Sequence, residues 1–394
     1  MTYIDNMLHK NFVIGEYRLV EHIGKGSYAN VWKAEHIQVS TLVAIKVIKK
    51  ELLNDDVSKT RFEREIKLLK SIHHPYVAEF YELLEDTNHF FIAMEFAEMG
   101  SILDFVNAKG KLEESVAKHY FAQIISVMDY LYHKHIVHRD IKCENVLIDK
   151  YNNIKIVDFG LSNVFTDEHP FLNTACGSPA YVSPEIVSHN PYTFKTDIWS
   201  IGILMYAICA GHLPFNDPNM SKLLQKVVHD NISFPSFFGC SLLDLLVKML
   251  QRNPLLRINL NEILKHEWFD QKEWESCLNA CKTISEYNDD VEKQIVSILD
   301  HKGILDINYS YSPISMSPIY KIIRRELLKE QTKYHDPMFL FQPISLRPSK
   351  QITAPIMKPI CNNNDQKAKL KHICFRRCSK PQIFNNPKRK LNCE

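Results

Sequence analysis

Residues 138–145 read His138-Arg139-Asp140-Ile141-Lys142-Cys143-Glu144-Asn145, the most informative string in the chain. Thirteen positions beyond Asn145 stands a second string, Asp158-Phe159-Gly160. Together they place two Asp carboxylates, one Asn amide and one Lys at fixed spacing. Such a set can accept a proton and can supply oxygen ligands to a hard cation such as Mg²⁺. Either string alone could arise by chance, so the prediction depends on matching parts elsewhere.

Matching parts occur upstream. Residues 17–35 read as two strands around a glycine turn with the sequence Gly24-Lys25-Gly26-Ser27-Tyr28-Ala29-Asn30-Val31. Glycine has no Cβ, so the backbone N–H groups of such a turn can approach a phosphate closely. A β-branched run then ends in Lys46, and apolar residues at helical spacing predict a helix over 61–72 that carries Glu65.

These motifs, in this order, resemble those of eukaryotic protein kinases. The resemblance covers about residues 17–269. It implies a bilobal α+β fold with ATP bound between the lobes. The smaller lobe, over 17–95, is expected to hold an antiparallel sheet and one helix, and the larger lobe, over 98–269, to be mainly helical.

The resemblance also implies roles for individual residues. Asp140 would accept or orient the hydroxyl proton of a protein substrate, and Lys142 would steady the transferred phosphoryl group. Asn145 and Asp158 would hold Mg²⁺. The residues implied in nucleotide binding are Ile23, Gly24, Lys25, Gly26, Ser27, Val31, Ala44, Lys46, Glu65, Met94, Glu95, Ala97, Leu147 and Asp158.

Structural roles follow for residues next to this set. Asp197, on an apolar helix expected over 196–211, is predicted to be buried and to hold the catalytic-loop backbone by hydrogen bonds, because an unpartnered buried carboxylate is costly. Arg257 is predicted to pair with Glu185. The residues expected to pack as a spine between the lobes are His138, Phe159, Leu69 and Phe80.

The segment before Ser183-Pro184-Glu185 narrows the resemblance to Ser/Thr kinases. Thr174-Ala175-Cys176-Gly177-Ser178-Pro179 resembles the calcium/calmodulin-dependent group, within it the branch of the AMP-activated and microtubule-affinity-regulating kinases. In that branch an upstream kinase phosphorylates the residue at position 174. Arg139, beside the catalytic Asp, would pair with the phosphate and order the loop. An unmodified Thr174 remains the alternative, and Ser178 is expected to shape the substrate-binding loop.

Substrate preference is partly readable. Glu144 matches a position that binds an Arg upstream of the phosphorylated residue in basophilic kinases. A second acidic position of the family is occupied here by Ser101, after Met99 and Gly100. The sequence therefore predicts a weakened preference for basic residues.

Two other functions stay open. A catalytically dead scaffold would use the same fold only to bind partners, but such chains typically lose one of Lys46, Asp140 or Asp158, which are all present. A small-molecule phosphotransferase would lack the protein-substrate features around Glu185. The departures from the family pattern, Ala29 and Ser183, are mild.

Residues 270–330 are expected to be a helical extension after a short N-terminal extension over 1–16. One apolar stripe runs through Val291, Ile295, Ile298 and Leu299 behind Asp289-Asp290 as plausible caps, and another through Ile319, Ile322, Ile323 and Leu327. Relatives carry a small ubiquitin-associated-like domain at this place. The alternative is two amphipathic helices docked on the helical lobe.

The tail from 331 to 394 is basic, with 13 Lys/Arg against 3 Asp/Glu. Since the whole chain has a net charge of +2, residues 1–330 carry a net charge of about −8. The composition of the tail predicts disorder. It is either simply solvated or contacts an anionic membrane or nucleic acid. The ten cysteines lack the spacing of zinc ligands, which suits a reducing compartment. The apolar stretches are too short to predict a membrane span. We therefore expect a cytoplasmic and also nuclear location.

Overall fold

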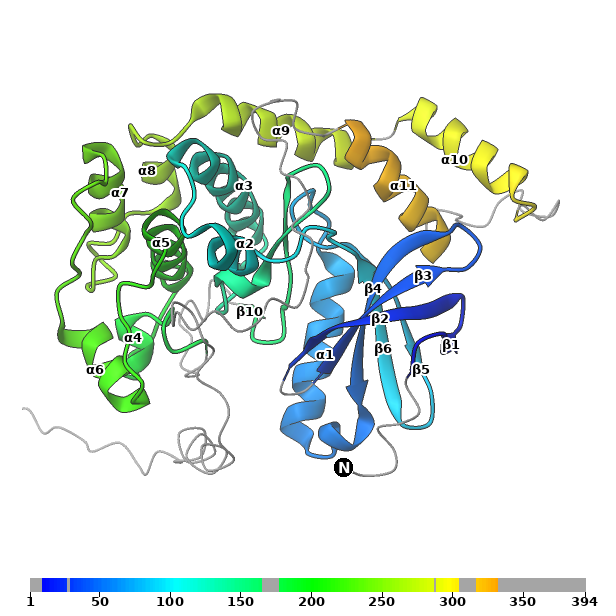
Figure 1. Ribbon diagram of the computed structural model, residues 1–394, viewed down its shortest axis with the longest axis horizontal. Helices are drawn as coiled ribbons and strands as arrows, with labels where there is room; N and C mark the ends of the chain where they lie inside the picture. Colours follow the sequence, from blue (N-terminus) through cyan, green and yellow to red (C-terminus); the bar gives the residue numbers. More distant parts are fainter. Residues whose placement is uncertain (1–8, 27–28, 165–176, 287, 305–316, 332–394) are drawn as a thin grey trace, which may run out of the picture. The chain divides into compact units, whose positions relative to one another are not determined.

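The computed structural model describes residues 9–26, 29–164, 177–286, 288–304 and 317–331 (Figure 1). Within these ranges the chain forms a lobe built on an antiparallel sheet, a mainly helical lobe, and a helical extension. The two-lobed α+β architecture predicted from the sequence is confirmed. Ser27 and Thr174, two of the predicted functional residues, lie outside the described ranges.

The first lobe is built on a six-stranded antiparallel sheet with strand order β1-β2-β3-β4-β6-β5. Its strands are β1 (Val13–Ile14), β2 (Tyr17–Lys25), β3 (Ala29–His36), β4 (Thr41–Lys49), β5 (Phe80–Glu85) and β6 (His89–Glu95). β4 is rich in Val and Ile, which suit a buried, pleated strand. Val31 pairs with Lys46 and Ala44 with Met94 across neighbouring strands. The register therefore gathers residues that the sequence analysis assigned to the ATP site.

One long helix accompanies this sheet. After the short 3₁₀ helix η1 (Lys50–Leu53), α1 (Asp56–Ser71) lies along the sheet in Figure 1. The Asp55 carboxylate caps it by accepting a hydrogen bond from the Ser58 backbone N–H at 2.9 Å. The apolar pattern predicts this helix only from residue 61, because the polar first turn carries no apolar period.

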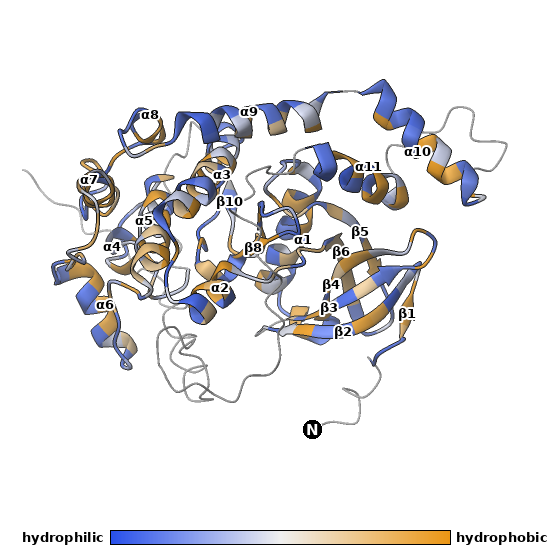
Figure 2. Ribbon diagram, turned by 45° about the horizontal axis from the view of Figure 1, so that its top comes forward, coloured by the Kyte–Doolittle hydropathy of each residue, from blue (hydrophilic) through white to orange (hydrophobic). Residues whose placement is uncertain are grey.

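The second lobe surrounds α5, a helix that is buried along nearly its whole length and is largely hydrophobic in Figure 2. The helices of this lobe are α2 (Ile102–Lys109), α3 (Glu114–His133), α4 (Pro184–Val187), α5 (Lys195–Ala210), α6 (Met220–His229), α7 (Cys240–Met249) and α8 (Leu260–Leu264). No helix of the described residues is long and apolar enough to cross a membrane.

Two small strand pairs position the signature strings between the lobes. The elements are β7 (Ile136–Val137), which pairs with β10 (Asn163–Val164), and β8 (Val146–Ile148), which pairs with β9 (Ile154–Ile156). The first string lies between β7 and β8 and includes the 3₁₀ helix η2 (Cys143–Asn145), and the second lies between β9 and β10. The pairs therefore hold both strings in short loops at fixed separation.

The extension forms α9 (Gln271–Ser285), α10 (Asp289–His301) and α11 (Pro318–Gln331). The two apolar stripes predicted from the sequence do not include α9, whose fully buried side chains are only Cys277 and Ala280 among the described residues. α9 contacts α3 of the helical lobe, where the His119 Nδ1 atom lies 2.8 Å from a Glu273 carboxylate oxygen. The two predicted stripes belong to α10 and α11, and both contribute to one small apolar core.

Two expectations about these helices were wrong. The N-cap of α10 is Asn288, whose side-chain oxygen accepts from the N–H of Asp290 at 3.0 Å and of Val291 at 3.2 Å. The aspartates follow the cap in the first turn, where their charge favours the helix N-terminus. α11 does not dock only on the helical lobe: Ile322 is fully buried in the core of the sheet lobe.

Candidate active site

The loop 138–145 is anchored by a buried carboxylate on α5. The backbone N–H groups of His138 and Arg139 donate to the two oxygens of Asp197, each at 2.8 Å. Burial raises the pKa of Asp197 to about 6, and the two hydrogen bonds oppose that rise. Because the partners satisfy both oxygens, the carboxylate can be accommodated in the core. The predicted role of Asp197 is confirmed.

The Asp140 carboxylate is held by three side chains. One oxygen accepts from Lys142 Nζ at 2.7 Å and from the Asn145 amide at 3.0 Å. The other oxygen accepts from the Ser178 hydroxyl at 2.8 Å. The structure thus brings together the three residues that the sequence assigned to catalysis, and it adds Ser178.

Ser178 reaches this position because the chain approaches the catalytic loop very closely at Gly177. Gly177 has a φ of +107°, and a Cβ there would lie 2.9 Å from the Arg139 carbonyl oxygen. Only glycine tolerates this conformation and contact. The Ser178 hydroxyl also accepts from Lys142 at 2.8 Å, so it bridges the two catalytic side chains.

A second charged group joins the two lobes. Lys46 Nζ lies 2.6 Å from a Glu65 oxygen and 3.3 Å from an Asp158 oxygen. Burial would lower the pKa of Lys46, but the two carboxylates outweigh it and raise that pKa; Lys46 in turn lowers the pKa of Asp158. Lys46 and Asp158 are therefore both charged at neutral pH. The predicted partnership of Lys46 with Glu65 is present.

Asp158 keeps part of its surface free for a ligand. Its side chain is 45% exposed, whereas that of Glu65 is 10% exposed. Asp158 and Arg139 adopt positive φ angles of 67° and 69°, which cost energy for residues with a Cβ. Strained backbone held in place by its surroundings is typical of functional sites.

The residues expected around the nucleotide come from both lobes. Ile23 is 45% exposed on β2, whereas Ala44 and Ala97 are buried. Leu147, on β8, bridges to Ser101 at the start of the helical lobe. Gly24, Lys25 and Gly26 form the end of β2 and its turn. Glu95, at the end of β6, turns its side chain into a buried ion cluster described below.

The donor set fits a magnesium ion. The Asn145 amide nitrogen donates to Asp140, which leaves its amide oxygen for another partner. The Asp158 carboxylate is charged and partly exposed. Mg²⁺ prefers hard oxygen ligands, usually one or two carboxylates or amides together with substrate phosphates.

His138 and Phe159 pack rather than react. Their ring centroids lie 4.7 Å apart, and both side chains are buried in the core that also contains Leu69 and Phe80. Burial lowers the pKa of His138 to about 4, so the ring is neutral at physiological pH. This is the spine expected from the sequence. The predicted pair of Arg257 and Glu185 is also present, with two contacts of 2.7 and 2.9 Å.

Glu144 lies beside the catalytic loop with an unused oxygen. Its Oε2 atom is buried and accepts no hydrogen bond from the described residues. Burial raises its pKa, and the negative charges of Asp140 and Asp104 act in the same direction. Asp104 also accepts from the Ser101 hydroxyl at 2.6 Å. The sequence analysis found no acidic group at Ser101 and missed the carboxylate that α2 brings there, three residues later.

A cluster of arginines was missed as well. A cavity of about 350 Å³ between α1 and the segment after Gly160 is lined by Arg61, Arg64 and Arg139. Arg139 already donates to the Leu161 carbonyl at 2.5 Å and to the Tyr192 hydroxyl at 2.8 Å. The signal available in the sequence was the three-residue spacing of Arg61 and Arg64, which places both on neighbouring positions of one helix face.

Comparison with known proteins agrees with this geometry. The family described as "Protein kinase domain" matches residues 17–269. The SNF1-related protein kinase catalytic subunit alpha KIN12 of Arabidopsis thaliana is 41% identical over 258 residues, which are 66% of this chain and 52% of that protein. The carbon catabolite-derepressing protein kinase of Candida tropicalis is 38% identical over 259 residues, 66% of this chain and 42% of that protein.

A third relative is the serine/threonine protein kinase OSK3 of Oryza sativa subsp. indica, 38% identical over 254 residues. The match covers 64% of this chain and 50% of that protein. The chain thus spans about half the length of the curated relatives it matches.

Proposed function

Because the chain belongs to the protein kinase family, we propose that it is a protein serine/threonine kinase that transfers the γ-phosphate of ATP to Ser or Thr of protein substrates. The observation that carries this proposal is the joint assembly of two groups, Asp140 with Lys142 and Asn145, and Lys46 with Glu65 and Asp158. A scaffold that only binds partners has no need of either.

The side chains divide the work of phosphoryl transfer. Asp140, held in place from both oxygens, accepts a hydrogen bond from the substrate hydroxyl and orients it for attack. Lys142 Nζ lies 2.7 Å from Asp140 and places a positive charge beside the phosphoryl group as it passes to the substrate hydroxyl. Lys46, oriented by Glu65, pairs with the nucleotide phosphates. Because phosphoryl transfer needs little covalent help, positioning and charge account for most of the catalysis.

Asn145 and Asp158 would hold Mg²⁺, which when bound neutralises charge on the phosphates. Asp158 remains ionised because Lys46 lowers its pKa. Asn145 donates its amide N–H groups to Asp140 and presents its amide oxygen elsewhere. Asn145 therefore connects the proposed metal site to Asp140, the group that orients the substrate.

The test is transfer of labelled phosphate from Mg-ATP to a positional peptide library with Ser, Thr or Tyr as acceptor. Wild type is run beside Asp140→Ala. We expect transfer to Ser and Thr that disappears in the variant. Equal transfer by both proteins, or transfer to Tyr alone, would overturn the proposal. No transfer after treatment with an activating kinase would favour the scaffold.

Regulation by phosphorylation of Thr174 through an upstream kinase is part of the proposal. A phosphate brings close to two negative charges at neutral pH, and the cavity lined by Arg61, Arg64 and Arg139 offers guanidinium groups that match it. Thr174→Ala should then block activation, and Arg64→Ala should lower the activity of the phosphorylated form only. Activation of Thr174→Ala to the wild-type level would contradict this part.

Glu144 is proposed to bind a basic residue upstream of the acceptor. Its free buried oxygen supports this, and Asp104 adds negative charge nearby. The sequence predicts a weakened preference for substrates with an upstream basic residue, because Ser101 replaces an acidic residue. The Asp104 carboxylate would instead strengthen that preference. Selection at the upstream positions of the peptide library separates the two.

The motif around Thr174 supports placement in the calcium/calmodulin-dependent group. Residues 270–330 are proposed as a helical extension, for which a ubiquitin-associated-like domain is the alternative. The basic tail over 331–394 is proposed as a segment that contacts an anionic membrane or nucleic acid. A cytoplasmic and nuclear location is proposed because the five cysteines in the described ranges are free thiols, which suits a reducing compartment.

A further inference from the structure

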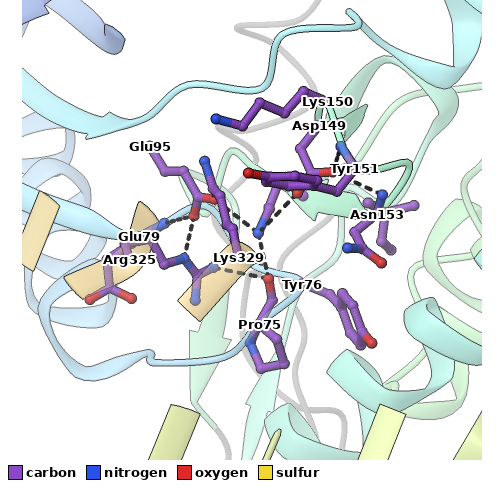
Figure 3. Close-up of polar contacts among 12 residues, drawn as sticks. Pro75, Tyr76, Glu79, Glu95, Asp149, Lys150, Tyr151, Asn153, Arg325 and Lys329 are labelled. Atoms are coloured by element: carbon purple, nitrogen blue, oxygen red, sulfur yellow. Dashed lines mark hydrogen bonds and ion pairs between the residues drawn. The ribbon is translucent and has the colours of Figure 1, made fainter. Parts of the chain in front are cut away.

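A buried ion cluster ties α11 to the end of β6 and to the loop that follows α1 (Figure 3). At its centre is Glu95, whose side chain is 1% exposed. Its oxygens lie 2.8 Å from Arg325 Nε, 2.9 Å from Lys155 Nζ and 3.2 Å from Lys329 Nζ. Burial alone would raise the pKa of Glu95, but the three cations hold it well below its usual range.

Arg325 does more than neutralise this carboxylate. One of its terminal nitrogens donates to three backbone carbonyls, those of His74 at 3.0 Å, Pro75 at 2.9 Å and Val77 at 2.8 Å. These carbonyls lie in the loop between α1 and β5. A planar guanidinium carries five N–H donors in a fixed plane, so it can serve a carboxylate and several carbonyls in set directions, whereas an ammonium has only three donors.

Two segments support the nucleotide site: this loop, and the hinge, which runs from Glu95 at the end of β6 toward α2 of the helical lobe. The loop follows α1, the helix that carries Glu65, and so sets the position of the carboxylate that orients Lys46. Glu95 ends β6, and its backbone is expected to face adenine. The two are also tied directly, because Glu95 N donates to the Glu79 carbonyl at 2.8 Å and Glu79 N donates to the Glu95 carboxylate at 3.1 Å.

We propose that Arg325 is a positioning residue of the nucleotide site, which joins the hinge to the loop after α1 and keeps the adenine-binding and phosphate-binding parts in register. This inference rests on the proposed function. We expect α11 to support nucleotide binding rather than to inhibit it, because in the structure α11 is docked while Lys46 and Glu65 lie 2.6 Å apart. The docked helix therefore coexists with an assembled site and supports it.

The experiment measures the Kd of the Mg²⁺ complex of a non-hydrolysable ATP analogue by calorimetry, and the KM for ATP and kcat, on the full chain. The variants are Arg325→Met and the milder Arg325→Lys. The matched control is Arg324→Met, because the polar contacts of the Arg324 side chain with the described residues lie within the extension, at Ile284, Glu286 and Glu292. Thermal midpoints are recorded for all four proteins, and binding is measured well below the lowest midpoint.

We expect Kd and KM to rise about tenfold in Arg325→Met, since small displacements of ligand-holding groups have effects of this size or larger. Arg325→Lys should fall between it and wild type, Arg324→Met should match wild type, and kcat at saturating ATP should change less than KM. A fall in thermal midpoint with unchanged Kd in Arg325→Lys would show a merely structural role and overturn the proposal. So would tighter binding or higher activity in either Arg325 variant, which would make α11 a restraint.

Failure of the proposed function is distinguishable from failure of this inference. If wild type binds the nucleotide but transfers no phosphate to any peptide, the kinase proposal fails while the Kd comparison still decides the role of Arg325. If wild type binds no nucleotide, both are overturned.

Discussion

Two ion clusters at the junction of the lobes invite comparison. In the catalytic cluster, Lys46 and Asp158 have side chains that are 18% and 45% exposed. In the hinge cluster, Glu95 and Arg325 are 1% and 4% exposed. The hinge cluster is enclosed by protein, whereas the catalytic cluster leaves surface free. Charges that hold the structure are closed off from water, and charges that meet a ligand are left partly open.

The largest expected effect is on catalysis, at a residue of the site that is left open to ligands. Asp140→Asn keeps the size and much of the hydrogen bonding of the side chain but loses the charge that orients and accepts the substrate proton. We expect kcat to fall by about 10³-fold or more, in the range for loss of a general base. Steady-state phosphoryl transfer checks this, with circular dichroism to show that the fold persists. A variant that retains a tenth of the wild-type kcat would contradict the role given to Asp140.

The next largest effect is on the free energy of unfolding, through the buried hinge cluster. Glu95→Gln leaves the buried Arg325 guanidinium beside a neutral amide, while Lys155 and Lys329 keep their contacts with Asp149 and Glu326. Breaking a buried ion pair in this way costs about 3–5 kcal/mol of unfolding free energy. Urea unfolding checks this. The matched control is Glu35→Gln, whose pair with Arg18 is exposed and 3.8 Å long, and which should cost less than about 1 kcal/mol. Equal losses in the two variants would remove the distinction between the clusters.

A smaller effect is expected in substrate choice. Glu144→Gln removes the carboxylate with the free buried oxygen, so peptides with an upstream Arg should lose about tenfold in kcat/KM, equivalent to about 1.4 kcal/mol. Peptides without a basic residue should be unaffected. Ratios of kcat/KM for matched Arg and Ala peptides measure this. An unchanged ratio would place the recognition of basic residues elsewhere.

The last prediction concerns the dependence of stability on pH. His36 is buried, and burial lowers its pKa from 6.5 to about 4. Between these values the unfolded chain binds a proton that the folded protein does not, so acidification from pH 6.5 to 4 destabilises the fold by up to about 3 kcal/mol through this group. The stability is fully present above pH 6.5. In His36→Gln, the slope of unfolding free energy against pH in this window should be lower by about one proton. Identical slopes would refute it.

The sequence was enough to predict the catalytic cluster but not the hinge cluster, for a physical reason. Phosphoryl transfer demands particular residue types at particular places, so Lys46, Asp140 and Asp158 stand in recognisable strings. Glu95 and Arg325 are separated by 230 positions. Their pairing depends on how α11 docks, which no local pattern encodes. The roles of Asp197 and of the pair Glu185–Arg257 were predictable because a buried charge requires a partner.

Helix ends and docking sites were predicted less well. The apolar stripes marked α10 and α11 but not where α11 binds, because an apolar stripe states only that a face is covered. α9 was missed because its contacts with α3 are partly polar, through His119 and Glu273. Asp104 was missed because the start of α2 turns its carboxylate back toward Ser101, a capping contact rather than a motif position.

The most direct test of the central claim, that charges of the open catalytic cluster act on the ligand directly whereas charges of the closed hinge cluster act by holding the structure around it, is to measure phosphoryl transfer and unfolding free energy together for Asp158→Asn. The account predicts a loss of transfer of at least about 100-fold with a stability change within about 1 kcal/mol, because this half-exposed carboxylate contributes little to folding. Retained transfer, or a stability loss as large as that of Glu95→Gln, would contradict it.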